Sequence, residues 1–113
     1  MSFDRGVRLG VDVGQVRVGV AISDPDGILA TPLVTLARDL KAPDGVIPAD
    51  IAEIARLVRI HEGVGVVVGL PVRLTGDEGP AAVGARAYAQ RVAAAIDPVP
   101  TWLSDERDRK SVV

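Results

Sequence analysis

The stretch RLGVDVGQVRVGVAISD, residues 8–24, decides the fold. Its apolar residues alternate with small or polar ones, which is the period-2 pattern of strands with one buried face. A short segment around Gly14 and Gln15 separates two such runs, as in a turn that joins antiparallel strands. The stretch therefore predicts a β-hairpin.

Asp12 is the candidate functional residue of this hairpin, because it lies inside an apolar run between Gly10 and Gly14. A carboxylate that is buried in such a place needs a partner. One interpretation is a structural aspartate that hydrogen-bonds the backbone near Gly14. The other is a metal-binding or catalytic carboxylate, with glycines that let a phosphate and a hard cation approach the backbone. The spacing is compatible with both.

Composition limits the class of protein. A chain of 113 residues predicts a single domain, residues 1–113, and 48% hydrophobic residues are typical of a soluble globular protein. Thirteen Lys and Arg against 15 Asp and Glu give a net charge of −2, so any site for a polyanion must be local. The lack of cysteine excludes disulfides and thiolate metal sites. We expect a cytoplasmic protein without a membrane span or signal peptide.

The rest of the chain predicts further strands and two helices. We expect a third strand from Ile28 to Leu36, a helix from Pro48 to a stop at Gly63, a strand from Val64 to Leu70, a helix from Pro80 to Ile96 and a last strand from Val99 to Ser104. Pro32 favours an edge position or a break for the third strand. Three hairpin-type strands followed by alternating helices and strands predict an α/β fold with a mixed sheet, in the order strand, strand, strand, helix, strand, helix, strand.

Carboxylates follow or end two of these strands. In open α/β sheets, sites lie at the carboxyl ends of strands. Asp12 lies late in the first strand, and Asp105 and Glu106 follow the last, so the three converge if those strands are parallel neighbours. Such carboxylates suit paired Mg²⁺ ions about 3.5–4 Å apart, one activating a water and the other the leaving oxygen in phosphodiester cleavage. For Asp105 and Glu106 the alternative, a solvated surface pair, is favoured by spacing alone.

Basic and backbone groups near these carboxylates could bind phosphate. Arginine forks fit phosphate oxygens, although a solvent-facing charge is the alternative and is the one expected for Arg73. The corner at residues 69–71 forms a backbone wall for nucleic acid, or is simply a strand end. The candidates for substrate binding are Arg17, Arg107, Gly14, Gly69 and Pro71.

Four other residues are better explained structurally. Trp102 could stack a nucleic-acid base, but a lone tryptophan in a predicted strand favours a core position. His61, near the end of the first helix, favours an interaction with the helix dipole. Asp77 and Glu78 are expected in a loop.

The motifs GVDVGQVRVGVAISD, VVGLPVRLTGDEG and SDER, in this order, resemble the YqgF family, whose members are described as pre-16S ribosomal RNA nucleases and as Holliday junction resolvases. They cover most of residues 8–107. The resemblance implies a ribonuclease H-like fold, a cytoplasmic location and metal-dependent phosphodiester cleavage in 5′-end processing of pre-16S ribosomal RNA. It also implies that Asp12 and Glu106, joined by Asp105, are the catalytic carboxylates, with Asp12 and Glu106 binding Mg²⁺ or Mn²⁺.

The resemblance ends after Arg107. Family members continue with a hydroxyl-rich stretch and further helices, one of which carries another aspartate, whereas residues 108–113 read DRKSVV. We therefore expect the family's C-terminal helix to be missing, the sheet face that it covers to be exposed or covered by a partner, and both Mg²⁺ binding and activity to be weak.

Two other functions fit parts of the sequence. Actin-like ATPases and sugar kinases share a G-x-D-x-G hairpin, but this chain is too short for their two lobes. A catalytically inactive RNA- or ribosome-binding module would not need Asp12 and Glu106. Nothing in the sequence recognises bases, so pre-ribosomal RNA and branched DNA are both candidate substrates, and the oligomeric state is open.

Overall fold

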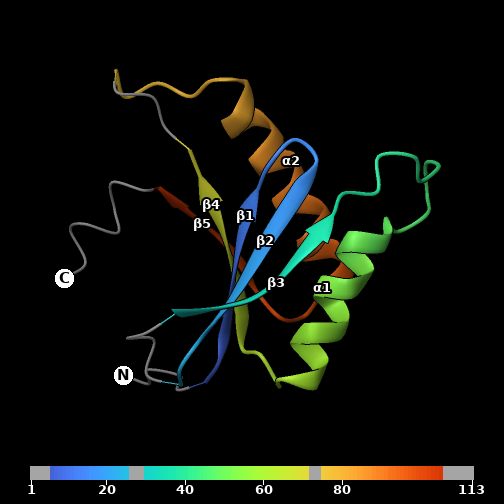
Figure 1. Cartoon of the computed structure of the whole chain (residues 1–113), viewed down its shortest axis with the longest axis vertical. Helices are drawn as coiled ribbons and strands as arrows, with labels where there is room; N and C mark the ends of the chain where they lie inside the picture. Colours follow the sequence, from blue (N-terminus) through green and yellow to red (C-terminus); the bar gives the residue numbers. More distant parts are fainter. Residues whose placement is uncertain (1–5, 26–29, 72–74, 106–113) are drawn as a thin grey trace.

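A five-stranded mixed sheet is the framework of the computed structural model, which describes residues 6–25, 30–71 and 75–105 (Figure 1). Its strands are β1 (Arg8–Val13), β2 (Arg17–Ser23), β3 (Ala30–Ala37), β4 (Gly65–Leu70) and β5 (Thr101–Asp105), in the spatial order β3-β2-β1-β4-β5. The first three strands pair antiparallel, and β1, β4 and β5 pair parallel. The predicted α/β architecture and the predicted element order are therefore confirmed.

The hairpin of β1 and β2 has the register that the alternating pattern predicts. Val11 pairs with Val20, and Asp12 pairs with Gly19. Because side chains alternate between the two faces of a strand, the valines point to one face while Asp12 and Gly19 share the other. We call the second one the open face.

Strand β3 is an edge strand, as Pro32 predicts. Among the described residues it pairs only with β2, and Val20 is opposite Val34 whereas Ala21 is opposite Pro32, so Leu33 is an extra residue in the ladder. A proline has no N–H to donate, which explains why it lies on an edge beside a bulge. The predicted start of this strand, Ile28, lies outside the described residues.

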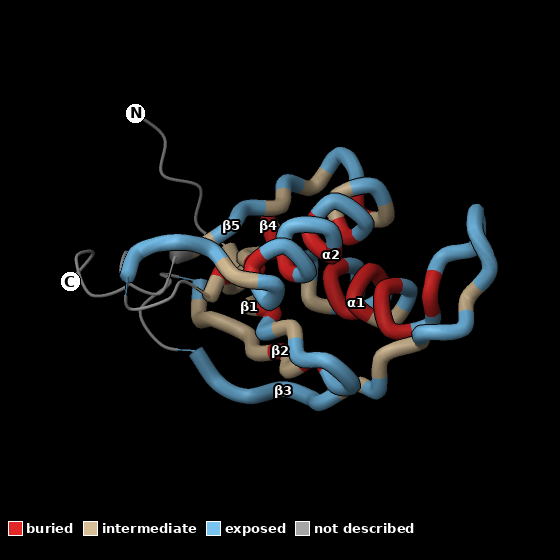
Figure 2. Tube along the Cα trace, turned by 90° about the horizontal axis from the view of Figure 1, so that it is seen from above, coloured by how far each residue is buried: buried red, intermediate tan, exposed pale blue. Residues whose placement is uncertain are grey.

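Two helices, α1 (Ala49–Ile60) and α2 (Pro80–Ile96), cover one face of the sheet (Figure 2). Pro80 occupies the first turn of α2, where its missing N–H costs nothing, and Pro48 is the N-cap residue of α1, without a side-chain cap hydrogen bond. His61 lies at the C-terminal cap of α1. Neither helix is long and apolar enough to cross a membrane, a finding that covers only the described part of the chain.

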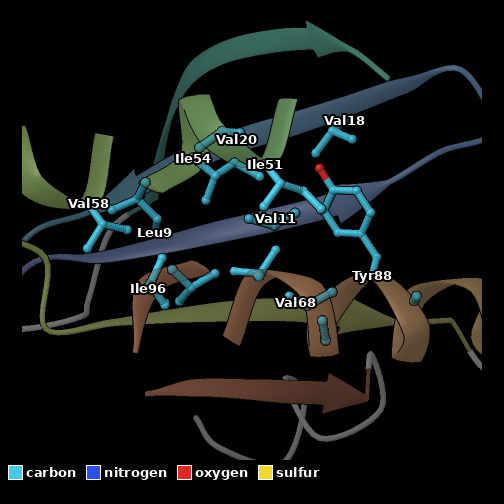
Figure 3. Close-up of a cluster of buried hydrophobic side chains, with 14 of the residues drawn as sticks. Leu9, Val11, Val18, Val20, Ile51, Ile54, Val58, Val68, Tyr88 and Ile96 are labelled. Atoms are coloured by element: carbon cyan, nitrogen blue, oxygen red, sulfur yellow. The ribbon is translucent and has the colours of Figure 1, made fainter. Parts of the chain in front are cut away.

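The core lies between the helices and the valine face of the sheet (Figure 3). Side chains from β1, β2 and β4 meet those of α1 and α2 there, and the largest that are fully buried are Leu9, Val18, Ile51, Ile54, Val66, Val68 and Val92. The period-2 and period-3.6 patterns of the sequence thus supply the two surfaces of one core.

Neither α1 nor α2 covers the open face (Figure 2). One residue of this face contradicts its sequence interpretation. Trp102 is 44% exposed and does not belong to the core. The interpretation was wrong because β5 is an edge strand and Trp102 pairs with Val67 rather than with a residue of the buried face. Its ring lies where a side chain on Gly65 would be, with the Arg8 guanidinium carbon 5.9 Å from the ring centroid.

The last strand differs from its predicted bounds at both ends. It begins at Thr101 instead of Val99, because the Val99 N–H donates to the Ile96 carbonyl (2.8 Å) in the turn that follows α2. It continues to Asp105, which is therefore the final residue of β5 and does not follow the strand.

Candidate active site

The carboxyl ends of three parallel strands meet at one edge of the sheet. Val11 of β1 pairs with Val68 of β4, and Gly69 pairs with Ser104 of β5, so Asp12 lies level with Gly69 and Ser104. Strands β1 and β5 are parallel, but they are not neighbours, because β4 lies between them. The ends of β1 and β5 are thus two strand spacings apart, about 10 Å.

Of the three predicted carboxylates, the structure describes the side chain of Asp12 and the backbone of Asp105. Asp12 is described in full, and the backbone of Asp105 pairs with Leu70 at the same edge of the sheet. Glu106 and Arg107 lie outside the described residues, as does Arg73. The structure therefore brings the ends of their two strands to a common edge.

Asp12 is exposed on the open face, so it is not a buried charge that requires a partner. Its cross-strand neighbour is Gly19, where even a Cβ would stay 3.9 Å from the Asp12 Cβ. A groove of about 670 Å³ runs beside it over β1, β2 and β3. The groove is lined largely by small side chains and includes Gly10, Asp12, Gly19, Ala21, Pro32 and Thr35. The carboxylate is thus accessible to a solute in this groove.

The turn between β1 and β2 is tight and needs its glycine. The Gly14 N–H donates to the Arg17 carbonyl (2.8 Å), so this N–H is engaged within the turn. It is therefore not the backbone group near Gly14 that the structural interpretation pairs with Asp12. A Cβ on Gly14 would approach the Arg17 carbonyl oxygen to 2.9 Å, closer than real Cβ contacts come. Arg17 is exposed and lies two residues before Gly19, so it shares the open face with Asp12.

Gly69 and Pro71 flank the corner after β4, whereas Asp77 and Glu78 lie in the loop before α2. Gly69 lies level with Asp12, and Pro71 follows the buried end of the strand at Leu70. The loop interpretation of Asp77 and Glu78 is confirmed, because neither belongs to a helix or strand. Glu78 binds Arg86 in α2 (2.8 Å from Arg86 Nε), and this hydrogen bond holds the pKa of Glu78 below its usual value.

Sequence patterns missed a cluster of four residues beneath the turn, Arg38, Asp39, Asp50 and Tyr88, which we call the Arg38 cluster. The Arg38 guanidinium donates to the Gly14 carbonyl (3.2 Å), and its backbone N–H donates to the Val16 carbonyl (2.9 Å). The guanidinium carbon lies 5.3 Å from the centroid of the Tyr88 ring, within the range of a cation–π contact.

Tyr88 and Asp50 form the buried part of the Arg38 cluster. The Tyr88 hydroxyl donates to Asp50 Oδ2 (2.7 Å), and the Asp39 N–H donates to Asp50 Oδ1 (3.2 Å). Asp50 is 4% exposed and Tyr88 3%. Burial, together with the Asp50 carboxylate, raises the pKa of the Tyr88 phenol, so the phenol stays protonated and remains a donor. Tyr88 fits the apolar period of α2, but no local signal pairs it with a residue 38 positions away.

The donor set partly fits a hard divalent cation. Carboxylate oxygens are the ligands that Mg²⁺ and Mn²⁺ take, and Asp12 offers one beside a groove. Within the described ranges, no group of three or more His, Cys, Asp or Glu side chains is close enough to hold a metal. The side chains expected to complete the set, those of Asp105 and Glu106, are not among those described.

The fold and the edge of the sheet define a class of protein. A mixed sheet in this order, with both helices on one face, is ribonuclease H-like. The solved structure titled "T. thermophilus RuvC in complex with Holliday junction substrate" shares it, with a TM-score of 0.58 and 17% identity, over 94% of this chain and 68% of that chain. The family model RuvX, described as Holliday junction resolvase, matches residues 6–109. The chain belongs to this family, which is the YqgF family that its motifs resemble.

Curated relatives agree with this assignment. A protein of Streptomyces avermitilis is 51% identical over 108 residues, covering 95% of this chain and 65% of its own length. A protein of Nocardia farcinica is 56% identical over 103 residues, covering 91% of this chain and 57% of its own length. Both carry the name "Putative pre-16S rRNA nuclease". The chain thus spans 57% to 65% of the length of these two relatives.

Proposed function

We propose that this chain carries the catalytic edge of a metal-dependent nuclease that hydrolyses phosphodiester bonds in the 5′-end processing of pre-16S ribosomal RNA. The observation that carries the proposal is the exposed Asp12 carboxylate at the end of β1, beside a groove and at the same edge as the end of β5. Membership of the RuvX family supports the nuclease chemistry, and the names of the relatives support the substrate. A cytoplasmic location belongs to the same proposal.

The proposed metal ligands are Asp12 and Glu106, with Asp105 as a third catalytic carboxylate. The parallel register of β1, β4 and β5 supports this assignment, because Asp12, the next-to-last residue of β1, and Asp105, the last residue of β5, lie toward the same edge of the sheet. Mg²⁺ or Mn²⁺ held by these oxygens, as a single ion or a pair, would supply a bound water of lowered pKa and neutralise charge on the phosphate. Residues 108–113 differ from the family pattern, and we propose that this chain is weakly active.

The chain's own residues bind and orient the phosphodiester. Arg17 shares the open face with Asp12, and its guanidinium would donate to the non-bridging phosphate oxygens, a role that we also assign to Arg107. We assign Gly14, Gly69 and Pro71 to the same substrate-binding surface: Gly14 permits the tight turn beside Asp12, Gly69 leaves space for the sugar-phosphate backbone, and Pro71 closes the corner after β4. Attack by water forms a new P–O bond while the bond to the leaving oxygen breaks; the attacking water gives up one proton to the solvent, and the leaving oxygen takes one from it.

Branched DNA is the second candidate substrate, because the matching family model is described as a Holliday junction resolvase. Both substrates present the same phosphodiester to the site. A protein with a net charge of −2 must bind either through local groups such as Arg17. An inactive RNA-binding module is the alternative without chemistry.

Cleavage of a 5′-extended 16S ribosomal RNA precursor in Mg²⁺ tests the proposal, with a four-way DNA junction assayed in parallel. We expect Asp12→Asn to lower the rate roughly 100-fold or more, which corresponds to about 2.7 kcal/mol of transition-state stabilisation. Asp97→Asn, at the exposed C-terminal cap of α2, is the matched control and should leave the rate unchanged. Equal rates for Asp12→Asn and the unmodified chain would remove Asp12 from the mechanism. Binding of the RNA without cleavage would favour the inactive module.

A further inference from the structure

We propose that Arg38 is a positioning residue that holds the turn between β1 and β2 and thereby fixes Asp12 relative to Arg17. The inference rests on the proposed function, because it gives the turn a role at the catalytic edge. Arg38 itself lies on the other side of the sheet from Asp12, beside Tyr88 of α2. It acts through the backbone of the turn and makes no contact with substrate.

Arg38 binds the turn at two carbonyls. Its backbone N–H donates to Val16, which extends the ladder of β2 and β3 beyond the last pair, Arg17 with Ala37. Its guanidinium donates to Gly14 (3.2 Å), two residues after Asp12. The Gly14 N–H also donates to the Arg17 carbonyl. The turn is therefore held by one hydrogen bond within it and by two from Arg38, the residue that follows β3.

Within the part of the chain that the structure describes, burial contributes little to holding the turn. Residues 14–17 are all exposed, and Val16 is 58% exposed, so the turn buries almost no apolar surface. Exposed turns with few buried contacts open at low free-energy cost. A turn that opens would change the separation of Asp12 and Arg17, because it connects them directly.

Arg38 is itself held in a rigid setting. Its guanidinium lies over the Tyr88 ring, and the Tyr88 hydroxyl is fixed by Asp50 in the first turn of α1. Asp50 accepts from the Asp39 N–H, and Asp39 Oδ2 accepts from the Ala49 N–H (3.0 Å). Through the Arg38 cluster, the turn is thus connected to the first turn of α1 and to the middle of α2. Groups that are locked in this way hold a site to within the small displacements that catalysis tolerates.

Two substitutions separate positioning from mere stability. Arg38→Met keeps the apolar stem but removes the guanidinium donors, whereas Arg38→Lys keeps a charged donor that can reach a carbonyl. Arg56→Met is the matched control, because Arg56 is an exposed arginine of α1 whose side chain pairs with Glu53 (2.7 Å).

The first measurement is the solvent-exchange rate of the Gly14 amide by NMR, with no metal or substrate present. We expect Arg38→Met to raise the Gly14 exchange rate at least about 10-fold while amides of β4, such as that of Val68, keep their rates. Arg56→Met should change neither the Gly14 rate nor the Val68 rate.

The second measurement is steady-state cleavage. We expect Arg38→Met to lower kcat roughly 10- to 100-fold with KM within about twofold, and Arg38→Lys to recover part of kcat.

Unchanged Gly14 exchange in Arg38→Met would overturn the proposal, as would a kcat equal to that of Arg56→Met in a preparation that cleaves. A parallel rise in exchange at Gly14 and Val68 would also overturn it, because it would assign Arg38 a role in global stability alone. If the unmodified chain does not cleave, the proposed function fails, and the exchange measurement still decides whether Arg38 holds the turn.

Discussion

Asp50 is a charged side chain with only 4% of its surface exposed, and its position is tolerable because two donors satisfy it. A buried carboxylate without partners would carry a large desolvation cost. The raised pKa of Tyr88 belongs to the same arrangement, since a phenol that remains protonated can always donate to Asp50. The pair is therefore a structural device of the core and not a proton-transfer pair.

Tyr88→Phe tests this device. The change keeps the ring under Arg38 but removes the hydroxyl that donates to Asp50, so we expect the free energy of unfolding to fall by about 1–3 kcal/mol. Urea unfolding followed by circular dichroism measures the change. Val83→Ala, at an exposed position of the same helix, is the control and should change stability by less than about 0.5 kcal/mol. A loss no larger than in the control would mean that water replaces the hydroxyl without cost.

At the scale of elements, sequence patterns succeeded where the cause of structure is local. Pro48 and Pro80 marked the starts of the helices, and alternation marked the hairpin, because capping and side-chain periodicity act over a few residues. Trp102 was misjudged because its exposure depends on which strand lies at the edge, a property of the whole sheet. The Arg38 cluster was missed for a related reason: Arg38 and Asp39 follow β3, whereas Asp50 and Tyr88 belong to α1 and α2, and the four residues meet only after folding.

The candidate site was predicted in the same uneven way. Asp12 could be singled out as a carboxylate between glycines in an apolar strand, and its place at a carboxyl end follows from the parallel pairing of β1 and β4. The supporting contact from Arg38 to Gly14 spans 24 positions and leaves no periodic trace in the sequence. The sequence thus indicated the candidate carboxylate Asp12, but it did not indicate the hydrogen bond from Arg38 that holds the neighbouring turn.

Helix α2 offers a simple gain in stability. Gly84 lies inside the helix, is exposed, and has open space where a Cβ would be placed. We expect Gly84→Ala to raise the free energy of unfolding by about 0.5–1 kcal/mol, because alanine loses less backbone freedom on folding than glycine. Chemical denaturation measures the gain.

Gly65→Ala is the matched control for this substitution. The same methyl group in β4 would overlap the ring of Trp102, so the ring must move and no gain in stability is expected. Trp102 is the sole tryptophan, and its fluorescence should therefore change in Gly65→Ala but not in Gly84→Ala. Equal gains for the two variants would contradict the placement of the indole over Gly65.

At the scale of the whole molecule, titration of carboxylates should limit stability on the acidic side. Hydrogen bonds from the N–H groups of Ala49 and Lys41 hold the pKa of Asp39 below its usual value of 3.8. Since the pKa is lower in the folded state, the stabilisation is present above the usual value and is lost as the pH falls through the folded-state pKa. The lowered pKa values of Glu53 and Glu78 act in the same direction.

We therefore expect stability to be nearly constant around neutral pH and to decline below about pH 4. Asp39→Asn should reduce this decline, because asparagine does not titrate. Thermal unfolding at a series of pH values measures both curves, and Asp97→Asn, an exposed site where α2 ends, serves as the control. An identical acid limb in Asp39→Asn and the unmodified chain would show that Asp39 contributes nothing to the pH dependence.

The bulge at Leu33 has a consequence for how molecules of this protein meet one another. An outer strand with free backbone donors and acceptors invites a second chain to add to the sheet, and β3 has no charged side chain to repel such a neighbour. Pro32 lacks a donor, and the extra residue shifts the spacing of the remaining groups, so an incoming strand finds no continuous row with which to align. The bulge that interrupts the ladder thus disfavours edge-to-edge pairing of two molecules at high concentration.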